Sequence, residues 1–136
     1  MNYSANASVI FGAPALRAER VRALLAEIPD LLERLEEGEA ALSQEEGYLL
    51  LELYIAEEGE IWDAARALGG FALEAGPDSG GPGWAGTPEE SFELLPHNFI
   101  RIAQALEAWR GTNPPVGEGA LEAFLALVRE AEREEV

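Results

Sequence analysis

YLLLELYIA, residues 48–56, is apolar or aromatic at every position except Glu52. A run of this kind forms either a helix buried on most sides or a buried strand, and periodicity alone does not separate the two. Ser43 and Glu46 precede the run with the spacing of a capping box, the side-chain pair that begins many helices. Because leucine also favours helices, we expect residues 48–56 to form a central helix, with a buried strand as the alternative.

The segment between Pro14 and Gly38 carries a helical pattern. Its apolar residues recur at steps of three and four, as on one face of an amphipathic helix. They are Leu16, Val21, Leu24, Leu25, Ile28, Leu31, Leu32 and Leu35. Pro29 falls inside the pattern, and a proline removes one helical hydrogen bond and clashes with the preceding turn. We therefore expect a kink at Pro29, or a new short helix that begins there and ends by Gly38.

An N-terminal strand is expected over residues 3–11. Apolar and mainly polar residues alternate there with the period of two that is typical of a half-buried strand. The apolar members are Tyr3, Ala5, Ala7, Val9 and Phe11. Such a strand could pair within the domain, pair with its copy in a dimer, or remain a loose tail, since chain ends are often loosely held.

Glycine and proline divide the second half of the chain. Gly59 is expected to end the central helix, after which helical spacing resumes over residues 61–73. Residues 76–86, GPDSGGPGWAG, predict a Gly/Pro-rich internal loop. Residues 87–90, TPEE, combine an N-cap threonine, a proline at the first helical position and a capping-box glutamate, so they predict the start of another helix.

The last third of the chain predicts two further helices. Apolar residues from Phe92 to Trp109 recur at steps of three and four, and Pro96 interrupts them, so we expect a kink or a break at Leu95. After a turn over residues 111–117, apolar spacing over residues 121–128 predicts the final helix. The expected fold class is therefore mainly α: one acidic domain over residues 1–136, with four to five helices and one N-terminal β-strand at residues 3–11.

Charge limits the kinds of partner. The chain holds 26 acidic and 9 basic residues, for a net charge of -17. A charge of this sign repels phosphate backbones and anionic lipids, so direct nucleic-acid binding is the least expected function. The sequence has no apolar run of about 18 residues, and its N-terminus has neither the basic region nor the apolar core of a signal peptide. We expect a cytoplasmic protein that does not bind membranes.

The missing residue types limit the chemistry. Without lysine, the glycines of residues 80–86 cannot form a P-loop, and a Schiff base is excluded. Without cysteine and with the single histidine His97, a Cys-His nucleophile pair and most zinc sites are excluded. Glu93 and His97 stand four residues apart and could share a helix face, but Pro96 interrupts that helix. Paired glutamates arise by chance in so acidic a chain, so we expect no catalytic residue, no metal and no cofactor.

The candidate partner-binding residues are glutamates near the ends of expected helices, together with one tryptophan. Carboxylates near a helix C-terminus oppose the helix dipole, and this local cost is compatible with a role in binding. The tryptophan lies in the glycine-rich loop, where it either pins the loop onto the core or serves as an exposed aromatic anchor for a partner. The candidates are Glu36, Glu37, Glu39, Glu57, Glu58, Glu60 and Trp84.

The acidity favours a non-enzymatic protein-binding domain. It would be an acidic inhibitor, or an immunity- or antitoxin-like partner, that covers a basic surface of another protein. A narrower version is a phage-type mimic of nucleic acid, in which carboxylates stand where phosphates would be. The alternative is a homo-oligomeric structural or assembly protein that associates through the Phe92–Trp109 pattern or the N-terminal strand. A second alternative is an enzyme that uses only carboxylates and arginine.

Overall fold

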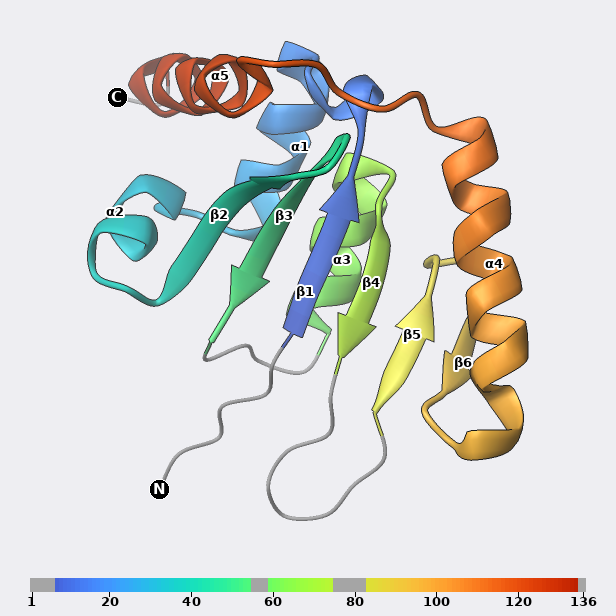
Figure 1. Cartoon of the computed structure of the whole chain (residues 1–136). Coiled ribbons are helices and arrows are strands. Elements are labelled where there is room, and N and C mark those ends of the chain that lie inside the picture. Colours follow the sequence, from blue (N-terminus) through green and yellow to red (C-terminus); the bar gives the residue numbers. More distant parts are fainter. Residues whose placement is uncertain (1–6, 55–58, 75–82, 135–136) are drawn as a thin grey trace, which may run out of the picture.

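The computed structural model describes residues 7–54, 59–74 and 83–134 and has a mixed α/β fold (Figure 1). Six antiparallel strands form one sheet in the order β2-β3-β1-β4-β5-β6. The strands are β1 (Ala7–Phe11), β2 (Ala40–Glu45), β3 (Tyr48–Leu53), β4 (Phe71–Glu74), β5 (Trp84–Gly86) and β6 (Ser91–Glu93). The helices are α1 (Ala18–Glu27), α2 (Leu31–Glu36), α3 (Glu60–Leu68), α4 (Phe99–Thr112) and α5 (Ala120–Glu134), with 3-10 turns at Ala13–Ala15 and Pro96–Asn98. The prediction of a mainly α domain with a single N-terminal strand is therefore wrong, and the fold is not all-α.

The run predicted as a central helix forms strand β3 (Tyr48–Leu53), and its described residues end at Tyr54. Leu49, Leu51 and Leu53 point to one face of the sheet and are fully buried, while the residues between them are half-buried on the other face. The second face is also packed, because the Tyr48 ring lies 5.5 Å from the ring of Trp109 in α4. A strand with packing on both faces shows no alternation of apolar and polar residues, and this is why the pattern resembled a buried helix.

The capping-box interpretation of Ser43 and Glu46 is wrong as well. Ser43 lies in β2, opposite Leu50 of β3, and Glu46 lies in the two-residue turn between these strands. Gly47 takes a φ of 82°, a left-handed conformation that glycine adopts without strain and that tight hairpins need. The backbone of β2 is already bonded to β3, so there is no helix N-terminus for a capping box to satisfy.

Residues 87–90 form the turn between β5 and β6 and do not start a helix. The Thr87 hydroxyl accepts a hydrogen bond from the Glu90 N–H at 3.1 Å, as an N-cap would. The Thr87 N–H, however, donates to the Glu90 carbonyl oxygen at 3.0 Å, and this bond closes a hairpin. Phe92 consequently lies in β6, and the next helix, α4, begins only at Phe99.

The helical spacing predicted over residues 61–73 also ends early. Helix α3 stops at Leu68, because Gly69 follows in a left-handed conformation with a φ of 68°. The chain then continues as β4. Of the predicted loop over residues 76–86, the last three residues form β5, and residues 76–82 lie outside the described part of the chain.

Four sequence predictions are confirmed. The described part of the N-terminal strand is β1, which lies at the centre of the sheet between β3 and β4 and so pairs within the domain. The first helical region breaks at Pro29, since α1 ends at Glu27 and a short helix, α2, follows. The pattern before α4 is interrupted at Pro96, and α5 is the final helix. Residues 3–6 lie outside the described part.

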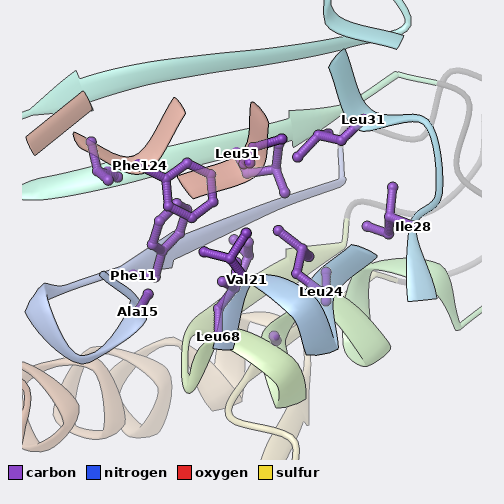
Figure 2. Close-up of a cluster of buried hydrophobic side chains, with 14 of the residues drawn as sticks. Phe11, Ala15, Val21, Leu24, Ile28, Leu31, Leu51, Leu68 and Phe124 are labelled. Carbon is purple, nitrogen blue, oxygen red and sulfur yellow. The ribbon is translucent and has the colours of Figure 1, made fainter. Parts of the chain in front are cut away.

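The main core lies between one face of the sheet and helices α1, α3 and α5 (Figures 1 and 2). Phe11 of β1 and Phe124 of α5 are fully buried, and their ring centroids lie 5.0 Å apart. Burial of a side chain of this size stabilises a fold by about 1.5–3 kcal/mol. A smaller apolar cluster lies on the other face, where α4 packs Trp109 against Phe71 and Ala85. The Trp109 indole N–H donates to a backbone carbonyl, so this ring holds α4 in place.

Candidate functional site

Most of the residues predicted to contact a partner lie at one end of the sheet. At this end β2 and β5 begin, and β3, β4 and β6 end (Figure 1). The corner between α2 and β2, the start of α3 and the start of β5 therefore lie along one rim. We call this rim the acidic end. It comprises Glu36, Glu37, Glu39, Glu52, Glu60, Glu74, Glu93 and Trp84.

The α2–β2 corner brings three of the predicted glutamates together. Helix α2 ends at Glu36, and Gly38 follows with a φ of 79°, which only glycine adopts easily. The Glu39 N–H then donates to the Arg34 carbonyl oxygen at 2.9 Å and closes the turn. This geometry holds the side chains of Glu36, Glu37 and Glu39 within a single tight bend.

The carboxylates of this corner repel one another. The charge of Glu33 raises the pKa of Glu37 above its ordinary value of 4.5. The charge of Glu39 is the next contribution, followed by partial dehydration, a hydrogen bond with Glu39, and the charge of Glu36. The negative end of the α2 dipole lies at the same place. A positive group placed against this corner would relieve the repulsion.

The neighbouring sheet face extends the negative charge. Glu39 lies opposite Tyr54, whose N–H donates to the Glu39 carbonyl oxygen at 3.1 Å, and Ala41 lies opposite Glu52. Because alternate residues of a strand share a face, Glu39, Glu52 and Tyr54 are neighbours on the face away from the main core. Dehydration first, and then the charge of Glu52, raise the pKa of Tyr54.

Glu60 has a structural partner at the start of α3. The guanidinium of Arg34 donates to both of its carboxylate oxygens, at 2.8 and 3.4 Å. The two side chains are only 16% and 17% exposed, so this ion pair is largely shielded from water. It ties α3 to α2, and a partner would reach Glu60 less easily than the α2–β2 corner. Glu57 and Glu58, the other two predicted glutamates of this group, lie outside the described residues.

Trp84 begins β5 at the other side of the rim. Its side chain is among the exposed large apolar groups, at 40%, and neither apolar cluster of the described residues includes it. In the register of the sheet it lies between Glu74 of β4 and Glu93 of β6. It also lines a groove together with Trp62 of α3. Trp84 is therefore not packed into either described cluster, and its role as an aromatic anchor for a partner stays a prediction.

Sequence reasoning missed four residues of this region: Glu52, Glu74, Glu93 and Trp62. The three glutamates meet Trp84 or the α2–β2 corner only through strand pairing, which connects residues far apart in the chain. Trp62 was interpreted only as part of a helical pattern. Had residues 48–53 been assigned to a strand, the alternation along β3 would have placed Glu52 on the face opposite the buried leucines.

The described residues show neither a metal-ligand cluster nor a buried polar side chain. Within residues 7–54, 59–74 and 83–134, no group of three histidine, aspartate or glutamate side chains is placed to hold a metal ion. The buried residues of the same part of the chain include no polar or charged side chain. Glu93 and His97 do not share a helix face, since Glu93 ends β6 and His97 lies in a 3-10 turn. No described helix is long and apolar enough to cross a bilayer.

Comparisons with protein-family models, with curated proteins and with solved structures find no match to this chain. Its function must therefore be argued from its own geometry and charge. The acidic end is the feature with the clearest physical signature, because its carboxylates lie close enough together to raise the pKa of Glu37.

Proposed function

We propose that this chain is a non-enzymatic protein-binding domain whose acidic end covers a basic surface of another protein. An inhibitor, or an immunity- or antitoxin-like partner, would work in this way. The observation that carries the proposal is the α2–β2 corner, where three glutamates lie within one bend. There the charges of Glu33, Glu39 and Glu36 raise the pKa of Glu37. Folding alone gains nothing from this repulsion, whereas binding to a cationic surface removes it.

The charge of the whole molecule supports the same proposal. A net charge of -17 accelerates the encounter with a basic protein and disfavours acidic partners. Exposed charges of this kind contribute more to association rate and selectivity than to affinity. Apolar contacts would supply affinity, and Trp84 on the same rim offers one. A narrower version, in which the carboxylates mimic nucleic-acid phosphates, requires a partner that itself binds nucleic acid.

A second candidate function, homo-oligomeric assembly, is favoured by one observation. Phe99 and Ile100 at the start of α4 are 54% and 73% exposed, and apolar side chains this exposed are common at contacts between proteins. Three other residues of the predicted Phe92–Trp109 pattern pack within the chain, because Ile102, Leu106 and Trp109 lie in the smaller cluster. Repulsion between two copies of charge -17 opposes assembly. The described residues add no support for an enzyme that uses only carboxylates and arginine.

The experiment that tests the proposal is capture of partners from native lysate by the tagged chain, at low and at high salt, with identification by mass spectrometry. We expect a stoichiometric basic protein that high salt releases, because screening weakens contacts between exposed charges. Retention of the chain's own copies alone, equally at both salts, would contradict the proposal and favour assembly. Size-exclusion chromatography of the pure chain separates the two cases independently.

A further inference from the structure

A groove opens at the acidic end, on the side of the sheet that α3 covers. It has a volume of about 440 Å³, and it is lined mainly by Trp62 and Arg66 of α3, Glu74 of β4, Trp84 of β5, and Pro88 and Ser91 from the hairpin that follows. The two tryptophans come from different elements, a helix and a strand, so the groove is formed by tertiary packing. It is open to solvent, since Trp84 is 40% exposed.

Small residues form the row of the sheet next to Trp84. In the row of the sheet next to Trp84, Ala72 of β4 pairs with Gly86 of β5, and Gly86 pairs with Ser91 of β6. A Cβ atom at Gly86 would come within 2.3 Å of the Glu90 carbonyl oxygen, so no larger residue fits there. The sheet therefore has only small side chains in the row next to Trp84.

The charges around Trp84 favour a cation. Glu74 and Glu93 flank it on neighbouring strands and on the same face, where directly opposite residues have Cβ atoms about 4.5–5.5 Å apart. An aromatic face attracts a cation, and two adjacent carboxylates strengthen that attraction. Arg66 also lines the groove, but its guanidinium donates to the Asp63 carboxylate at 3.0 Å, so a negative charge lies beside it.

We infer that this groove binds an arginine side chain, with the guanidinium against the indoles of Trp62 and Trp84 and its charge countered by Glu74 and Glu93. Arginine fits better than lysine because its planar, weakly hydrated guanidinium stacks on aromatic rings. The inference rests on the proposed function for the source of the arginine, a basic surface of the partner. The preference for a guanidinium can nevertheless be measured on the isolated chain.

The test is an NMR titration of the full chain with N-acetyl-arginine amide and with N-acetyl-citrulline amide, its neutral isostere. We expect the indole N–H signals of Trp62 and Trp84 to shift with the arginine probe. We expect the neutral probe to bind at least about fivefold more weakly than the arginine probe. The Trp109 indole N–H, bonded to the Gly69 carbonyl oxygen at 2.9 Å, should not shift. An N-acetyl-lysine amide arm measures the preference for arginine.

Two variants make the outcome specific. Trp84→Ala should abolish the shift at Trp62, whereas Phe99→Ala, which removes an exposed aromatic ring from α4 on the other face, should leave it intact. Equal binding of the two probes, lysine binding as tight as arginine, or shifts that survive Trp84→Ala would each overturn the inference. If the groove prefers the arginine probe over the other probes but no basic partner is captured, the proposed function fails and the inference about the groove holds. If a basic partner is captured but neither tryptophan signal shifts with the arginine probe, the inference about the groove fails and the proposed function holds.

Discussion

The two ends of the sheet use their polar side chains differently. At the end opposite the acidic end, the Gln44 side chain ties β2 to the start of α5. Its amide donates to the Gly117 carbonyl oxygen at 2.8 Å and accepts from the Leu121 N–H at 3.2 Å. At the acidic end, the carboxylates of the α2–β2 corner meet mainly charges of their own sign. The Gln44 side chain is thus bonded within the fold, whereas the carboxylates of the α2–β2 corner repel one another beside the bonded Arg34–Glu60 pair.

Acidity alone does not distinguish the two ends. The opposite end carries the exposed glutamates Glu45, Glu46 and Glu89 in and beside its hairpin turns. What differs is the arrangement, since the turns around them are tied down by bonds such as the one from the Val116 N–H to the Gly47 carbonyl oxygen at 2.7 Å. We propose that the opposite end and the core beneath it provide stability, and that the acidic end provides the surface for a partner.

The largest expected effect is on stability, and it is expected in the core beneath the end opposite the acidic end. Phe124→Ala should lower the free energy of unfolding by about 3–5 kcal/mol, because it leaves a cavity against Phe11 in the main core. Urea denaturation measures this change. Phe99→Ala removes the same ring from an exposed position and should stay within about 0.5 kcal/mol. Similar losses for the two variants would break the assignment of stability to the core under α5.

An intermediate effect on stability is expected at the Arg34–Glu60 ion pair. Arg34→Ala removes two hydrogen bonds to the largely shielded Glu60 carboxylate and should cost about 1–3 kcal/mol in unfolding free energy. Arg66→Ala is the matched control, because its pair with Asp63 is exposed and lies within one helix turn. That loss should stay below about 0.5 kcal/mol. Equal losses would mean that the Arg34–Glu60 pair does not hold α3 to α2.

The smallest effect concerns the pH dependence of stability. The pKa of Glu37 is raised in the folded protein, so its proton-linked contribution to stability is fully present below the unfolded value of 4.5 and is lost as pH rises through the folded pKa. Glu37→Gln should therefore be more stable than the native chain at neutral pH and equal to it below pH 4.5. Urea denaturation across this pH range checks the prediction. A difference that stays constant with pH would contradict the repulsion at this corner.

The sequence predicted individual elements better than their assembly. The break at Pro29 and the final helix follow from local rules that the fold obeys, and β1 was recognised from its alternation. The run over residues 48–53 was misassigned because packing on both faces of β3 removes the alternation that marks a strand. Residues 87–90 were misassigned because a hairpin turn and a helix start use the same Thr87 hydroxyl bond.

The candidate site was predicted only in part. Glu36, Glu37 and Glu39 are close in sequence, so local reasoning could group them. Trp84 joins Glu74 and Glu93 only through strand pairing, and no local pattern encodes that contact. The missed residues are therefore the ones whose neighbours depend on the sheet.

The central claim is that binding depends on the arrangement at the acidic end and not on total charge. Two triple variants with equal charge loss test it: Glu36→Gln, Glu37→Gln, Glu39→Gln at the acidic end, and Glu45→Gln, Glu46→Gln, Glu89→Gln at the opposite end. Affinity for the captured basic partner is measured for both by titration calorimetry at low salt. We predict a loss of about tenfold or more for the first triple and about twofold or less for the second. Equal losses would contradict the account, because the charge would then act as a diffuse field without a site.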